Sequence, residues 1–274
     1  MTGGGGVAAR DGSRRWRKNV SRALFLPASV ALLVLGSALL APVASGARQY
    51  EEPSYMVEAP WLAANLGRED LVILDARGEK AHRKGHIPGA VAVRWQEFAV
   101  TTGRPGSPKW GVAYNPGELA SRFALAGVDG DKTVVVYADP VRGWGEDGRF
   151  VWMLRMLGVK SSMFLNGGYP CWVSSGYPVS REAVKPRPTG FAVKEGAAGF
   201  SVDTSWMREN LGRAHIIDTR TREEFLGARR HGEARGGHIP GAVSIPHTSL
   251  LGAQGRLKPQ EELEEIFSEA GIGK

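Results

Sequence analysis

Short apolar runs alternate with amphipathic segments from about residue 56 onwards. The run Leu71–Leu74 is apolar throughout, as is typical of a strand buried on both faces of a parallel sheet, and Val134–Tyr137 has the same character. Between them, Leu119, Phe123 and Ala126 recur at helical spacing. The predicted strands are residues 71–74, 91–93, 134–137 and 162–165, and the predicted helices are residues 116–126, 148–157 and 171–175. This alternation predicts an α/β fold with a doubly wound parallel sheet flanked by helices.

A seven-residue segment, Gly-His-Ile-Pro-Gly-Ala-Val, occurs at residues 85–91 and again at residues 237–243. Each copy follows an apolar run that ends in Asp-x-Arg, and each precedes a Glu-Leu…Phe…Ala-Gly pattern. The period of about 150 residues is too long for a solenoid and fits two tandem domains. We therefore expect a first domain at 56–180, a Pro- and Gly-interrupted linker at 181–198 and a partial second domain at 199–274.

The N-terminal part of the chain has a different pattern. Residues 1–22 are Gly-rich and basic, and we expect them to be disordered. Residues 23–47 contain an uncharged apolar run long enough to span a bilayer, followed by small residues that suit signal-peptidase cleavage. A cleaved signal and an uncleaved hydrophobic helix that anchors the protein both fit. Either predicts export, to the periplasm or extracellular space or to an anchored position at the cell membrane.

The formal charge of +7 does not indicate nucleic-acid binding. Residues 1–47 account for +5 of it, beside the apolar run, where positive charge orients a segment at a membrane. No aromatic-basic module accompanies the charge, so we expect no nucleic-acid partner. Cys171 is the single cysteine, which excludes an intramolecular disulfide.

The two Asp-x-Arg pairs, the two Gly-His-Ile-Pro-Gly-Ala turns and the segment Leu165–Trp172 together resemble the tandem-domain thiosulfate and 3-mercaptopyruvate sulfurtransferases of the rhodanese superfamily. The resemblance covers about residues 56–274 and implies two rhodanese-like domains. It also implies ping-pong chemistry, in which a loop cysteine takes sulfur from a small donor as a persulfide and passes it to a thiol or cyanide. Such a cysteine must be a thiolate, and converging backbone N–H groups stabilise it. No cofactor is implied.

The position of the family's cysteine loop differs between the two copies. In the first copy the loop after Val134–Tyr137 begins Ala138-Asp139 and has no cysteine, as in the family's inactive first domains. In the second copy the counterpart of Ala138 falls about eight residues after Lys274. We therefore expect a fragment whose nucleophile follows Lys274, which is inactive as given and whose second copy is poorly folded because it lacks its central strand.

The resemblance also directs attention to particular side chains. Those expected to bind substrate or support the site are Asp218, Arg220, Arg222 and His238, and those expected to hold the structural motif are Asp75, Arg77 and His86. Glu224 stands where some family members have a substrate arginine, so the donor is left open between thiosulfate and 3-mercaptopyruvate. Cys171 lies after the last strand of the first copy and is interpreted as a packing residue.

Other functions remain as alternatives. His82 and His86 are too few ligands for zinc, so no metal is expected. A non-catalytic rhodanese-like binding or sensor module, tethered at the membrane, would lack the loop cysteine, and a phosphatase-like relative would have a longer loop. The oligomeric state is left open.

Overall fold

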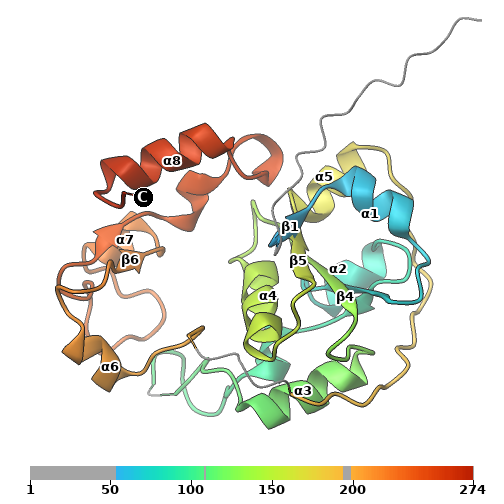
Figure 1. Ribbon diagram of the computed structural model, residues 1–274, viewed down its shortest axis with the longest axis horizontal. Helices are drawn as coiled ribbons and strands as arrows, with labels where there is room; N and C mark the ends of the chain where they lie inside the picture. The colour runs from blue at the N-terminus through green and yellow to red at the C-terminus, as the bar shows by residue number, and fades with distance from the viewer. Residues whose placement is uncertain (1–53, 108, 194–198, 274) are drawn as a thin grey trace, which may run out of the picture. The chain divides into compact units, whose positions relative to one another are not determined.

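The structure, a computed structural model, describes residues 54–107, 109–193 and 199–273 (Figure 1). Residues 49–274 form one compact unit. The predicted N-terminal basic region and hydrophobic helix, at residues 1–47, lie outside the described residues. Among the helices that the structure describes, none combines the length and the apolar character needed to cross a membrane.

The first copy contains a five-stranded sheet in which every pairing is parallel. In spatial order the strands are β1 (Met56–Val57), β5 (Ser162–Leu165), β4 (Thr133–Tyr137), β2 (Leu71–Asp75) and β3 (Val91–Ala92). The central strand β4 is β-branched through most of its length, and residues 134–137 are completely buried. The predicted doubly wound parallel sheet is therefore confirmed for this copy.

Helices cover both faces of this sheet (Figure 1). The helices are α1 (Ala59–Asn65), α2 (Glu79–Lys84), α3 (Pro116–Leu125), α4 (Glu146–Met156) and α5 (Gly168–Ser174). Successive residues of β4 point to opposite faces: Val134 and Val136 pack in one buried cluster with α3 and α4, and Val135 and Tyr137 pack in the other with α1 and α5.

The predicted elements differ from the observed ones mainly at helix starts. The helix predicted at 148–157 begins two residues earlier, at Glu146, and the one predicted at 171–175 begins three residues earlier, at Gly168. The prediction began at the apolar-rich stretch from residue 148 and left out Glu146 and Asp147. These acidic residues form the first turn of α4, where negative charge is favourable. The short elements β1, α1 and α2 were not predicted.

The second copy repeats part of this order. Its described elements are α6 (Thr204–Glu209), β6 (Ile217–Asp218), α7 (Arg222–Phe225), β7 (Val243–Ser244) and α8 (Gln260–Glu269). It also has the 3-10 turns η2 (His247–Leu250) and η3 (Ala253–Gly255), and the first copy has the 3-10 turn η1 (Trp95–Phe98). β6 and β7 pair in parallel, as β2 and β3 do. Within described residues 199–273, Ile245 is the one buried hydrophobic side chain, so this copy has only a small core.

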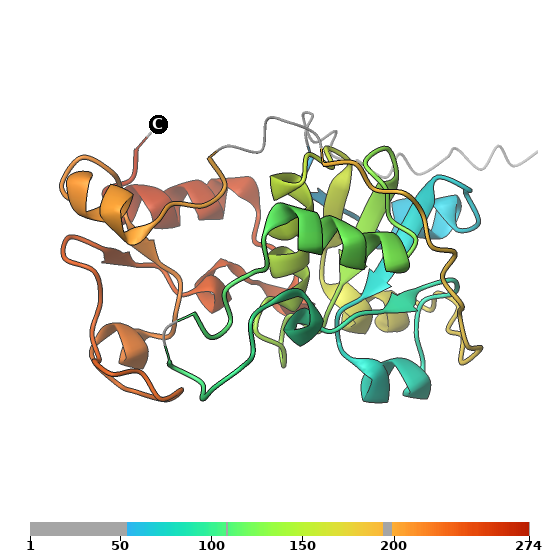
Figure 2. The same cartoon turned by 90° about the horizontal axis from the view of Figure 1, so that it is seen from below.

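The segment after α5 runs along the first copy without forming a helix or strand in its described part (Figures 1 and 2). Ser180 pairs with His86 through backbone hydrogen bonds in both directions. Further on, the Thr189 N–H donates to the Ala124 carbonyl. The predicted linker therefore begins as a strap hydrogen-bonded to the first copy.

Candidate functional site

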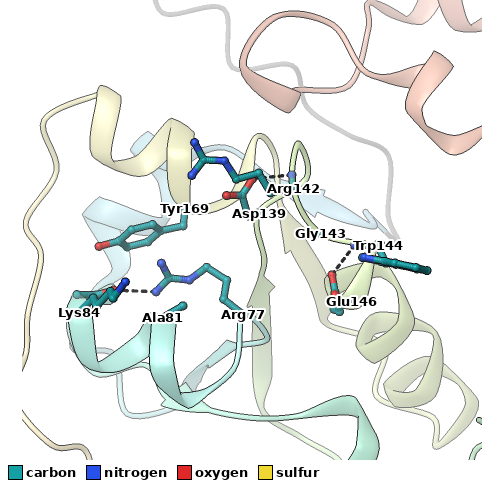
Figure 3. A pocket seen from close by; sticks show the side chains of 10 residues that line it. Arg77, Ala81, Lys84, Asp139, Arg142, Gly143, Trp144, Glu146 and Tyr169 are labelled. Carbon is teal, nitrogen blue, oxygen red and sulfur yellow. Dashed lines mark hydrogen bonds between the residues drawn. The ribbon is translucent and has the colours of Figure 1, made fainter.

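A cavity of about 580 Å³ opens at the carboxyl ends of β2 and β4 in the first copy (Figure 3). Arg77 and Lys84 form one wall, and Asp139 and Arg142, from the loop after β4, form another. Tyr169 of α5 also lines it. Ligands of parallel α/β sheets bind at this edge, because the loops that follow the strands meet there.

Arg77 clamps the turn that leads into the first Gly-His-Ile-Pro-Gly segment. Its Nε lies 2.9 Å and its Nη2 2.6 Å from the two Asp75 carboxylate oxygens, and Nη2 also donates to the Gly85 carbonyl at 2.8 Å. The guanidinium stacks 3.5 Å from the centre of the Tyr169 ring. Burial opposes its charge, but Asp75 outweighs this and raises the pKa of Arg77. The pair is almost fully buried, and its geometry agrees with a structural role.

His86 lies beneath this clamp, stacked on His82 with ring centres 3.7 Å apart. His86 Nδ1 is 3.0 Å from the His82 carbonyl, which is the backbone contact expected of the turn. His82 Nδ1 is 3.0 Å from an Asp75 oxygen. Burial lowers the pKa of His82 in spite of the attraction of Asp75. These contacts make both imidazoles part of the framework behind the cavity.

The loop after β4 binds its own carboxylates. Asp139 Oδ1 accepts the backbone N–H groups of Val141 at 3.2 Å and Arg142 at 3.1 Å. Glu146 Oε2 accepts the Trp144 N–H at 2.8 Å (Figure 3). Loops of this kind stabilise anions through converging N–H groups. Here side chains of the loop and of the first turn of α4 already supply the negative charge.

A third carboxylate, that of Asp147, lies under the loop. Its Oδ1 accepts the Gly148 N–H at 2.8 Å, and it also accepts from the Ala138 backbone. Burial raises its pKa to about 6. The loop after β4 and the first turn of α4 therefore hold three carboxylates, and none of them was predicted as a site residue.

The second copy repeats the clamp in a more exposed form. Arg220 Nε lies 3.0 Å from Asp218 Oδ1, and its Nη2 donates to the Gly237 carbonyl at 2.8 Å. The hydrogen bond from Arg220 lowers the pKa of Asp218. His238 Nδ1 is 2.8 Å from the Phe225 carbonyl, and its ring stacks on Phe225 at 3.7 Å. Phe225 thus occupies the place that His82 has in the first copy.

The structure brings three of the four predicted substrate residues to one cavity of about 580 Å³, which Asp218, Arg220 and His238 line. Arg222 is not among its lining residues; it is the exposed first residue of α7. Glu224 accepts the Thr221 N–H and hydroxyl, forming a capping box. The Glu224 carboxylate is therefore engaged at the start of α7, where it caps the helix.

Cys171 is buried in α5, with 2% of its surface exposed. Arg256 of the second copy donates to its Sγ at 3.3 Å and also pairs with Glu58. The neighbouring Leu257 N–H donates to the Asn166 side chain at 2.8 Å. The cysteine lies at a packed junction between the copies and lines neither of the two cavities described above. This placement agrees with its interpretation as a packing residue.

Among the described residues, one cluster brings possible metal-ligand atoms of three residues within 4.8 Å of one another: Glu224, His231 and Glu233. Glu224 is engaged in its capping box, and the Glu233 carboxylate accepts the His231 N–H at 2.8 Å. Hydrogen bonds within the protein therefore explain why these three side chains lie close together.

A family model of known proteins matches both copies of the repeat. The profile of the rhodanese-like domain matches residues 58–175 and 203–270. The chain therefore belongs to the rhodanese-like domain family.

Several relatives of this chain are named as sulfurtransferases. It is 30% identical over 270 residues to a putative thiosulfate sulfurtransferase of Synechococcus elongatus, covering 95% of this chain and 81% of that protein. It is 29% identical over 227 residues to the putative thiosulfate sulfurtransferase SseA of Mycobacterium tuberculosis, covering 80% and 74%. The crystal structure of SseA from Escherichia coli, described as a 3-mercaptopyruvate sulfotransferase, matches with a TM-score of 0.65 at 27% identity, covering 80% of this chain and 85% of that one.

Proposed function

We propose that this protein is an exported sulfurtransferase that moves sulfane sulfur from thiosulfate or 3-mercaptopyruvate to a thiol or cyanide. The observation that carries the proposal is the repeated Asp-x-Arg clamp on a Gly-His-Ile-Pro-Gly turn, formed by Asp75 and Arg77 in one copy and by Asp218 and Arg220 in the other. It occurs in a chain whose named relatives are sulfurtransferases.

The proposed reaction has two displacements. A cysteine thiolate attacks the outer sulfur of thiosulfate, the sulfur–sulfur bond breaks, and sulfite leaves with the bonding electron pair. Cyanide then attacks the terminal persulfide sulfur, thiocyanate leaves, and the thiolate is regenerated. This is nucleophilic catalysis by an activated cysteine. In this proposal the cysteine follows residue 274, on the loop after the central strand of the second copy.

Cys171 is a poor candidate for that nucleophile. It is almost completely buried, whereas a persulfide must meet both a donor and an acceptor. It also lies on α5, after β5, rather than on the loop after a central strand. A Cys171→Ser variant should therefore keep the activity of the natural full-length protein.

The experiment is a thiosulfate–cyanide assay that measures thiocyanate, run on the full-length natural gene product, on Cys171→Ser and on residues 1–274. We expect turnover by the first two and none by residues 1–274. Intact mass after incubation with thiosulfate alone should show a gain of one sulfur atom in the active proteins. Loss of turnover and of the added sulfur in Cys171→Ser, with an unchanged melting temperature, would assign the nucleophile to Cys171 instead.

A second candidate function is a non-catalytic rhodanese-like binding or sensor module tethered at the membrane. The loop after β4 supports it, because this loop begins Ala138-Asp139, has no cysteine, and binds the Asp139 carboxylate through its own backbone. Absence of thiocyanate formation by the full-length protein, with either donor, would favour this module over the enzyme.

A further inference from the structure

Two histidines of the first copy stack face to face where α2 leads into the Gly-His-Ile-Pro-Gly turn. The ring centres of His82, on α2, and His86 lie 3.7 Å apart, and the rings are inclined by 5°. His82 is 9% exposed and His86 is 1% exposed. Neutral rings pack well in this arrangement, whereas a charged ring loses solvation and faces its neighbour at close range. We call these two residues the histidine pair.

The hydrogen bonds of the histidine pair leave no favourable place for an added proton. His86 Nδ1 lies 3.0 Å from the His82 carbonyl, and it carries the hydrogen of this contact because a carbonyl can only accept. His86 Nε2 is buried and has no hydrogen-bond partner among the described residues. His82 Nδ1 contacts Asp75, whose carboxylate is already bound by Arg77 through two hydrogen bonds. A proton on His82 would therefore place a second cation beside Arg77 in a buried turn.

The charges around His82 act in both directions. Asp75 attracts a proton to the ring, whereas Arg77 and the other imidazole oppose it. Burial is the largest influence, and the pKa of His82 is lowered. Burial also raises the pKa of Tyr137, so its hydroxyl stays protonated throughout the acidic range. The other titratable groups on the elements that meet at this turn are Glu79, Arg83 and Lys84 of α2, Tyr169 of α5, and Arg181 and Glu182 of the strap.

The turn that contains the histidine pair holds the start of the strap. The His86 N–H donates to the Ser180 carbonyl at 2.9 Å, and the Ser180 N–H donates to the His86 carbonyl at 2.8 Å. The preceding carbonyl, that of Gly85, accepts from Arg77. Lys84 and Gly85 also line the cavity at the carboxyl ends of β2 and β4 (Figure 3). A change in the ring stack therefore reaches both the strap and one wall of this cavity.

The second copy builds the same stack with a ring that cannot titrate. Phe225 occupies the position of His82, and its ring lies 3.7 Å from that of His238 at the same interplanar angle of 5°. His238 Nδ1 lies 2.8 Å from the Phe225 carbonyl, as His86 Nδ1 does from that of His82. A phenyl ring therefore satisfies the packing of this turn, and the imidazole of His82 adds a titratable group that the stack does not require.

We propose that the histidine pair is an acid-sensitive switch, which holds the strap and the adjoining cavity wall in place at neutral pH and releases them when His82 takes up a proton. In the closed turn the pKa of His82 is lowered, whereas a turn that opens exposes the ring and restores its ordinary value of 6.5. Opening therefore becomes more favourable as the pH falls below 6.5 and is suppressed above it. The increase is limited to about tenfold for each pH unit below that value.

The test is hydrogen exchange of the full-length protein at pH 7.5, 6.5 and 5.5, read at the amides of His86 and Ser180. Each rate is divided by the intrinsic exchange rate at the same pH. In the parent this ratio should rise about three- to tenfold from pH 7.5 to pH 5.5. His82→Phe, which copies the ring of the second copy, should keep the ratio constant. His215→Gln, which removes an exposed histidine, is the matched control and should follow the parent.

A second variant covers the case in which His82→Phe does not fold. His82→Gln keeps a hydrogen-bond donor that can reach Asp75 and does not titrate in this range, so its ratio should also stay constant. Three results would overturn the proposal. They are a constant ratio in the parent, an equal rise in the parent and in the non-titrating variants, and a rise at the β4 amides in step with His86, which would show global unfolding rather than release of the strap.

Discussion

Replacing Asp147 with asparagine should change how the stability of the first copy depends on pH. The carboxyl group is buried beneath the loop after β4, and burial raises its pKa from 3.8 to about 6. Asparagine keeps an oxygen that can accept the Gly148 N–H but cannot titrate. The difference between the parent and Asp147→Asn therefore reports the effect of protonating the Asp147 carboxylate.

The sign follows from where the proton binds more tightly. Because the folded pKa of Asp147 is raised, the folded protein takes up a proton between about pH 6 and pH 3.8 that the unfolded chain does not. Stability from this group therefore increases as the pH falls through that window and is lost as the pH rises. The whole pKa shift corresponds to a change of about 3 kcal/mol in the free energy of unfolding, of which about 1 kcal/mol falls between pH 7 and pH 5.

Urea unfolding, followed by tryptophan fluorescence, to which the buried Trp172 contributes, measures this difference at pH 7, 6 and 5. The free energy of unfolding of the parent minus that of Asp147→Asn should rise by about 1 kcal/mol from pH 7 to pH 5. Glu182→Gln, which removes an exposed carboxylate, controls for net charge and should follow the parent. Parallel pH profiles for the parent and Asp147→Asn would refute the reasoning.

Other substitutions test the remaining contacts. Arg77→Ala leaves Asp75 buried and uncompensated and should cost about 3–5 kcal/mol in urea unfolding, whereas Arg220→Ala in the exposed clamp should cost about 1 kcal/mol or less. Equal costs would contradict the difference in burial. Because the pKa of His82 is lowered, its contribution to the free energy of unfolding falls as the pH drops below the ordinary histidine pKa of 6.5. His82→Phe should remove this loss, so the free energy of unfolding of the variant, relative to that of the parent, should rise from pH 7 to pH 5. Gly255→Ala would place a Cβ 2.5 Å from the loop after β4 and should speed hydrogen exchange at residues 252–257; unchanged exchange there would show that this contact is not formed.

Much of the first copy follows from its sequence because its strands are uniformly apolar. β2 and β4 are buried on both faces, and such runs are hard to place elsewhere. α3 was predicted from the helical spacing of Leu119, Phe123 and Ala126, and the structure adds Asn115 as its N-cap. The elements that were missed, such as β1 and α2, have two and six residues. Elements of that length carry too little periodicity and are held by their neighbours.

The chemistry of the candidate site was less accessible to sequence reasoning. The clamps could be predicted, because Asp-x-Arg fixes both partners within three residues. The carboxylate of Asp139 could not, since its hydrogen bonds depend on the path of the loop after β4. The contact of Arg256 with Cys171 joins residues 85 positions apart and needs the tertiary structure. The signal that the sequence offered was an acidic residue, Asp139, two positions after the predicted strand 134–137.

The strap that leaves the first copy defines where a shortened chain can be cut. Phe191 packs against the core of the first copy, and the Thr189 side chain donates to the Val128 carbonyl at 2.6 Å. A chain that stops at residue 180 would expose that part of the core and leave the Ala124 and Val128 carbonyls to water. The smallest autonomous folding unit therefore extends past Phe191, and proteolytic nicking before that residue should loosen α3 first.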